Sequence, residues 1–214
     1  MLVLDKLKKK IAIFVICGCL SLSNIAQNFG GGTIIGISTS QVSGDDLGGY
    51  NKAGLIIGAF ANRLIKKGLT FQMEMIYIQK GSHNPRMNDS EYRSYNVPDI
   101  YLSYIEIPIL LQHHQTNNLK IEGGLNSAYL INGYYNDSYG KMRDYGSSIF
   151  LKYDLGLMFG INYKYSDNIS LITRISNSII PIGDEDYNHL EAYNYQAKGK
   201  YNSVLSFTIN YNFS

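Results

Sequence analysis

The chain has 214 residues, of which 45% are hydrophobic, 17% charged and 13% aromatic, and its formal net charge is +2. This balance excludes a disordered protein, because disorder requires low hydrophobicity and high net charge, and no apolar run reaches the roughly 20 residues of a membrane-spanning helix. The small net charge leaves no basic footprint for nucleic acid, so we expect no nucleic-acid partner.

The N-terminal segment has the composition of an export signal. Lys6 and Lys8–Lys10 precede the apolar stretch Ile11–Leu22, and the small residue Ala26 follows shortly afterwards. A positive segment, a short apolar core and a small residue before the cleavage point are typical of a secretory signal peptide. We therefore predict a signal peptide over residues 1–26 and a mature domain over residues 27–214.

Both cysteines lie within the predicted signal peptide, so the mature chain would have no disulfide to stabilise it. A different interpretation stays open at this point, because Ile16-Cys17-Gly18-Cys19 loosely resembles a bacterial lipobox. In that case Cys19 would be the lipidated first residue of the mature protein.

Beyond the signal, apolar residues alternate with polar or small ones, as they do in strands that have one apolar face. Most of these alternating segments exceed the 5–6 residues usual in globular proteins and reach the roughly 9–11 residues of a tilted membrane-spanning strand. The alternation predicts eight strands: Thr33–Gln41, Ala53–Leu64, Leu69–Lys80, Tyr104–Gln112, Leu119–Ile131, Phe150–Lys164, Ile169–Ile179 and Tyr201–Phe213.

The connections between these strands alternate in length along the chain. Three are short, over residues 65–68, 115–118 and 165–168, and four are longer, over residues 42–50, 82–100, 132–148 and 181–200. Outer-membrane barrels show this asymmetry, with tight periplasmic turns at one end and longer external loops at the other.

Alternation alone does not decide whether the apolar face lines a barrel or coats it. A soluble lipocalin-like barrel turns its apolar face inward around a ligand, whereas a membrane barrel turns it outward to lipid. Here Tyr and Phe gather toward the ends of the apolar stripes, as in the aromatic girdles of membrane proteins. We therefore predict an all-β, eight-stranded antiparallel up-and-down transmembrane β-barrel, surrounded by outer-membrane lipid, and keep the soluble ligand-binding barrel as the alternative.

The polar faces of the predicted strands carry charged residues, which a membrane barrel would enclose. An eight-stranded barrel is just wide enough for side chains to fill its interior, and an unpaired buried charge is costly. We therefore expect an interior polar network, whose candidate members are Glu74, Glu106, Glu122, Lys152 and Arg174. Pairing within this network is its structural role, and a proton or ion path through a narrow channel is the alternative.

Several motifs carry a resemblance to a known family. Tyr104–Gln112 reads YIEIPILLQ, and the preceding strand ends in Gln79-Lys80-Gly81. Together with the glycine-rich Gly123–Leu130 and the later segment Tyr153–Leu157, they resemble the PorT-like outer-membrane β-barrel family of Bacteroidota, over about residues 30–213. The resemblance implies an eight-stranded outer-membrane barrel with little chemistry, and it implies envelope or secretion-system proteins as partners.

The sequence offers no recognisable catalytic, cofactor-binding or metal site. His113 and His114 are adjacent in a predicted strand and would point to opposite faces, while His83 and His189 lie in separate loops without catalytic spacing. The last long loop holds acidic residues that read as a solvated loop rather than a calcium site: Asp184, Glu185, Asp186 and Glu191.

The long loops are rich in Tyr interleaved with Asn, Asp and Ser, a composition that binding surfaces share. We therefore expect a non-catalytic outer-membrane protein with a structural, assembly-associated, secretion-associated or surface-interaction role. A narrow outer-membrane channel for small solutes is the alternative.

Overall fold

The computed structural model describes residues 29–45, 47–86, 97–137, 140–141, 150–183 and 199–213. The predicted signal peptide, Cys19 and much of three long connections lie outside these ranges. Within them, no helix has the length and apolarity to cross a membrane. The described residues form eight long strands and one two-residue strand: β1 Phe29–Ser43, β2 Lys52–Lys66, β3 Leu69–Ser82, β4 Asp99–His114, β5 Leu119–Asp137, β6 Gly140–Lys141, β7 Tyr153–Lys164, β8 Ile169–Ser178 and β9 Tyr201–Asn212.

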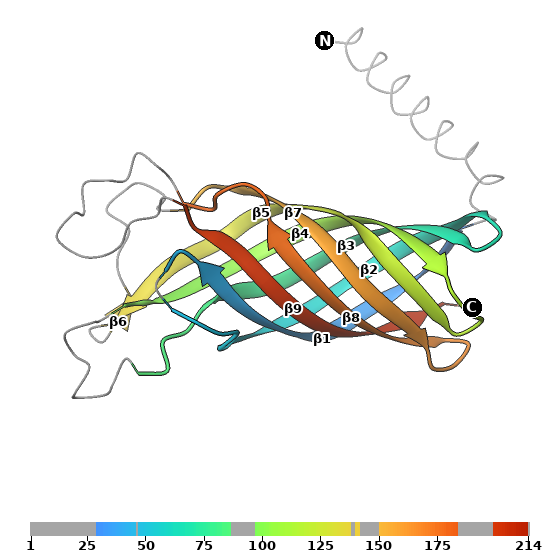
Figure 1. Cartoon of the computed structure of the whole chain (residues 1–214), viewed down its shortest axis with the longest axis horizontal. Coiled ribbons are helices and arrows are strands. Elements are labelled where there is room, and N and C mark those ends of the chain that lie inside the picture. Colours follow the sequence, from blue (N-terminus) through green and yellow to red (C-terminus); the bar gives the residue numbers. More distant parts are fainter. Residues whose placement is uncertain are drawn as a thin grey trace, which may run out of the picture.

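The eight long strands close into one antiparallel barrel (Figure 1). Each long strand pairs with the long strands before and after it in the chain, including β4 with β5 and β5 with β7, and β1 pairs with β9, so the sheet has no free edge among the long strands. Closure satisfies the backbone hydrogen bonds of every strand, which is the condition for β-structure in lipid. The predicted fold class is confirmed.

The strands differ from their predicted bounds where backbone pairing, rather than side-chain alternation, sets their length. β5 continues to Asp137 and pairs there with the short β6, although we expected a loop from residue 132. In the other direction, β7 begins at Tyr153 rather than Phe150, which instead forms an isolated bridge with Gly183. Both of these differences lie at the end of the barrel where the long connections are, whereas β1 begins four residues earlier than predicted at the opposite end.

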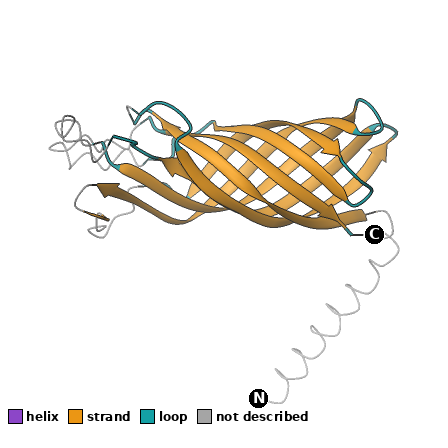
Figure 2. Ribbon diagram, turned by 90° about the horizontal axis from the view of Figure 1, so that it is seen from below, coloured by secondary structure: helices purple, strands orange, loops and turns teal. Residues whose placement is uncertain are grey.

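The two ends of the barrel are unlike each other (Figure 2). One end carries the three short turns after β2, β4 and β7 together with Phe213, which follows β9, and we call it the turn end. The tightest of these turns is Lys67-Gly68, where Gly68 has a φ of +82°, a backbone conformation that favours glycine. The other end carries the long connections, and we call it the loop end.

The outer wall is apolar and exposed. Large side chains such as Met75, Phe159 and Ile209 point outward, and Met75 and Phe159 are each 61% exposed. Aromatic residues lie at both margins of this wall: Tyr129 and Tyr153 toward the loop end, and Tyr163, Tyr211 and Phe213 toward the turn end. An apolar belt between aromatic girdles fits lipid, and it excludes the soluble lipocalin-like barrel, whose apolar face would point inward.

Candidate functional site

The lumen holds two clusters of buried charged residues. In the first, the turn-side cluster, Arg174 of β8 reaches across the barrel to Glu74 of β3. Its Nη1 and Nη2 donate to the two carboxylate oxygens of Glu74, each at 2.7 Å, and its Nε donates to Glu122 of β5. All three side chains are at most 4% exposed. Bidentate pairing of guanidinium with carboxylate is among the strongest and most directional hydrogen-bonding arrangements.

Two glutamines complete the turn-side cluster. Gln112 of β4 donates from its Nε2 to Glu122 at 2.9 Å and to the Oε1 of Gln72 at 3.0 Å, while the Nε2 of Gln72 donates to Glu74. The ammonium of Lys120 lies 3.4 Å from the Oε1 of Gln112. Strands β3, β4, β5 and β8 are therefore cross-linked by one hydrogen-bonded network, which fixes the side chains in the lumen.

The second cluster lies nearer the loop end, and we call it the loop-side cluster. The ammonium of Lys80 on β3 pairs with Glu106 of β4 and lies 3.7 Å from Asp154 of β7. Asn126 donates to Glu106 at 3.2 Å, and Asn202 donates to Asp154 at 2.9 Å. The three charged side chains are at most 2% exposed, so the barrel encloses them completely.

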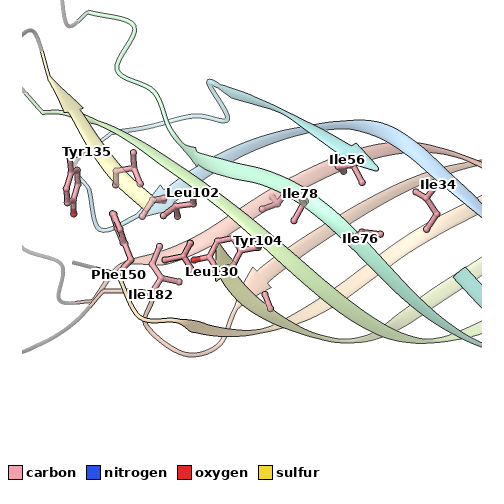
Figure 3. Close-up of a cluster of buried hydrophobic side chains, with 14 of the residues drawn as sticks. Ile34, Ile56, Ile76, Ile78, Leu102, Tyr104, Leu130, Tyr135, Phe150 and Ile182 are labelled. Carbon is pink, nitrogen blue, oxygen red and sulfur yellow. The ribbon is translucent and has the colours of Figure 1, made fainter. Parts of the chain in front are cut away.

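Above the loop-side cluster, apolar side chains fill the mouth of the barrel (Figure 3). Tyr135 of β5 packs on Phe150 with ring centroids 5.1 Å apart. Both rings are 2% exposed, and Ile182 beside them is fully buried. Leu102, Tyr104 and Leu130 continue this apolar cluster inward. The lumen is thus occupied by apolar packing at the loop end and by two charge clusters below it.

The interior is less polar than the sequence pattern predicts. Ile34, Ile56, Phe60 and Ile76 of β1–β3 point into the barrel and are buried. The first three come from β1 and β2, whose glycine-containing sequences alternate less regularly than the others, whereas Ile76 stands on the largely polar face of β3. Gly32 of β1 leaves space for Phe60, since a Cβ at that position would come within 2.8 Å of its ring.

The structure divides the five predicted network residues among three places. Glu74, Glu122 and Arg174 lie together in the turn-side cluster, and Glu106 lies in the loop-side cluster. Lys152 is exposed, because it precedes the first residue of β7 and the inward position of that strand belongs to Asp154. Lys80 and Asp154, which the prediction did not include, lie on the same polar stripes as the others.

The histidines do not form a metal centre in the described part of the chain, where no group of three or more His, Cys, Asp or Glu could hold a metal ion. His114 Nε2 lies 2.9 Å from the hydroxyl of Thr70, and His113 faces outward. His83 contacts the buried carboxylate of Asp99 at 2.8 Å between Nδ1 and Oδ2. His189 and the acidic residues 184–186 and 191 lie outside the described residues.

A closed eight-stranded barrel with an apolar wall and a filled lumen defines the class of small outer-membrane β-barrel proteins. The chain belongs to the family described as outer membrane protein beta-barrel domain, which matches residues 24–184. Membership of this family locates the protein in the outer membrane. Among curated proteins, none matches the sequence significantly.

Solved structures show the same fold at low sequence identity. Ail, the attachment invasion locus protein of Yersinia pestis, solved in complex with the heparin analogue sucrose octasulfate, has a TM-score of 0.51 and 11% identity, with 87% of this chain and 99% of that chain covered. Neisserial surface protein A has a TM-score of 0.52 and 14% identity, with 87% and 97% covered. At these identities the likeness shows the fold alone.

Proposed function

We propose that the protein is a non-catalytic, non-conducting surface scaffold, in which the barrel anchors the loop end in the outer membrane and the loop end contacts a protein partner. The observation that carries the proposal is the filled lumen. Apolar packing at the mouth and two charge clusters below it occupy the path that a solute would take.

The energetics of the lumen support a structural role. A passage would require Arg174 to leave Glu74 and Glu122, and separating a buried ion pair in this way costs about 3–5 kcal/mol. Lys80 and its two carboxylates form a second barrier of the same kind. A scaffold needs such cross-links, because they hold strands on opposite sides of the barrel in one geometry.

The asymmetry of the barrel supports contact at the loop end. The long connections gather there, and the β5–β6 hairpin extends beyond the position where β7 begins. Tyr-rich loops provide rigid contact area that is both apolar and polar. The resemblance to the PorT-like family supports an envelope or secretion-system protein as the partner.

One neighbour suggests a different kind of ligand, since Ail was solved with a heparin analogue. A polyanion needs a basic surface, and the last long loop of this chain contains Asp184, Glu185, Asp186 and Glu191. We therefore do not propose that the loops of this protein bind a polyanion, and we propose that they contact the surface of another protein instead.

Site-specific photo-crosslinking in native membranes tests the proposal. The photoreactive residue replaces either Asn51 at the loop end or Asn117 at the turn end, both of which are exposed asparagines outside the strands. We expect a discrete cross-linked protein from position 51. A product from position 117 alone would contradict loop-end contact and indicate a periplasmic assembly partner.

Planar-bilayer recording of the purified barrel tests the non-conducting part of the proposal. We expect no discrete conductance over a wide voltage range. Steady unitary currents would contradict the scaffold proposal and support the narrow-channel alternative. A change in the size of these currents in Arg174→Met would then show that the ions pass through the lumen.

A further inference from the structure

Two lysines flank a pair of stacked tyrosines on the outer wall near the loop end. The rings of Tyr101 on β4 and Tyr134 on β5 lie parallel, with centroids 5.0 Å apart and an interplanar angle of 3°. Lys52 Nζ lies 3.4 Å from the centroid of Tyr101, and Lys141 Nζ lies 4.2 Å from that of Tyr134. Cation–π contacts of this kind hold an ammonium in place while leaving N–H groups free for a ligand.

A polar groove of about 410 Å³ adjoins these residues. Its lining includes Gln79, Ser103 and Asn132, and the side chain of Gln79 donates to the hydroxyl of Tyr77 at 3.2 Å. Amide and hydroxyl groups interrupt the otherwise apolar wall here. We call Lys52, Gln79, Tyr101, Ser103, Asn132, Tyr134 and Lys141 the lysine–tyrosine patch.

The strand register places this patch relative to the membrane. Four outward-facing residues are consecutive partners across β3, β4, β5 and β7: Tyr77, Ile105, Tyr129 and Tyr153. The three tyrosines among them form the tyrosine row of the loop end. The next outward-facing row toward the loops is Gln79, Ser103 and Asn132, followed by the pair Tyr101 and Tyr134. Since aromatic girdles lie at the boundary between apolar chains and headgroups, the patch lies at headgroup level.

The charge of the patch indicates what occupies it. Two ammonium groups face outward, and the acidic neighbour Asp99 is 3% exposed. Its carboxylate accepts from the backbone N–H of Asn84 at 2.8 Å, contacts His83, and accepts from the hydroxyl of Tyr101 at 3.4 Å, so it is already engaged and buried beneath the patch. An anion is therefore favoured, and the anions at headgroup level in a membrane are lipid phosphates.

We propose that the lysine–tyrosine patch binds the phosphorylated sugar headgroup of an outer-leaflet glycolipid of the lipid A type. Lys52 and Lys141 contact its phosphates, and the groove with Gln79, Ser103 and Asn132 accommodates the sugar hydroxyls. The acyl chains lie along the apolar wall below the tyrosine row. This binding is independent of any protein partner at the loops.

Native mass spectrometry of the full chain, released from detergent in the presence of diphosphoryl lipid A, tests the proposal. The variant K52Q/K141Q removes both charges, and the control K66Q/K67Q removes two exposed charges at the turn end. We expect K52Q/K141Q to bind about twenty-five-fold more weakly than the wild type, since each lysine near anionic headgroups contributes about a factor of five. The control should bind as the wild type does.

Two further arms identify the ligand chemistry. K52R/K141R keeps the charges and should retain binding, which shows that any loss in the glutamine variant reflects charge rather than folding. Dephosphorylated lipid A should bind weakly, and inorganic phosphate at millimolar concentration should not compete. Equal binding by the wild type and K52Q/K141Q, equal binding of dephosphorylated lipid, or full competition by inorganic phosphate would each overturn the proposal.

Discussion

Gly160 of β7 lies directly beside Arg174 of β8, and a Cβ on Gly160 would come within 2.6 Å of the Cγ of Arg174. On its other side Gly160 pairs with Glu122 of β5. The absence of a side chain at this one position therefore lets the guanidinium of Arg174 cross β7 and donate to Glu122. The turn-side cluster depends on a residue that makes no polar side-chain contact itself.

Gly160→Ala should destabilise the barrel, because the added methyl group must displace Arg174 or the strand beside it. We expect a loss of about 1–3 kcal/mol in the free energy of unfolding, the usual effect of overpacking. Urea unfolding in detergent measures it. Gly48→Ala is the control, since nothing lies within 4 Å of a Cβ at that position, and equal midpoints for the two variants would contradict the steric argument.

Arg174→Met should be strongly destabilising, because it leaves Glu74 and Glu122 buried without their cation. The expected loss is about 3–5 kcal/mol, measured by urea unfolding. The triple variant E74Q/E122Q/R174M removes the charges together and should recover most of the lost stability. Identical losses in the single and triple variants would show that packing of the Arg174 side chain, rather than charge pairing, stabilises the lumen.

The faces of the strands could be predicted from the sequence, but the partners across the lumen could not. Strict alternation assigns Glu74, Glu122 and Arg174 to one side of their strands without stating how the barrel closes. Arg174 meets Glu74 only because β8 and β3 face each other across the lumen, which depends on strand count and register together.

Lys152 shows the second limit of the sequence pattern. Alternation continues from Asp154 back through Lys152, so the pattern places both on the inner face. β7 begins at Tyr153, however, and an exposed side chain just outside the strand follows no alternation. Lys80 stands on the same polar face of β3 as Glu74, so the alternation does place it inside the barrel. Its pairing with Glu106 and Asp154, however, depends on how the barrel closes.

Asp45, which follows β1 at the loop end, should make stability depend on pH. Burial raises the pKa of its carboxyl, although a hydrogen bond with Ser82 opposes this effect. Because the pKa is raised in the folded protein, protonated Asp45 adds to the free energy of unfolding. This stabilisation is fully present below the unfolded pKa of about 3.8 and is lost as pH rises through the folded pKa. At neutral pH the group is therefore destabilising.

Asp45→Asn tests this dependence, because the amide oxygen can still accept from the backbone N–H of Leu47. We expect the variant to be more stable than the wild type at pH 7, and the difference to shrink as pH falls, with a slope of at most about 1.4 kcal/mol per pH unit. Unfolding free energies at several pH values between 4 and 7 measure it. A difference that does not change with pH would contradict the titration of Asp45.

Leu125 lies in the middle of the outer wall, between its strand partners Ile109 and Leu157. Because the wall faces lipid, Leu125→Arg should destabilise the barrel in phospholipid vesicles by about 2–4 kcal/mol, the cost of an arginine near the bilayer midplane. Tyr165→Arg is the matched control, since Tyr165 lies in a turn at the membrane margin and is 70% exposed. Its cost should be about 0–1 kcal/mol. Similar losses for the two variants would contradict the placement of the apolar wall in the bilayer.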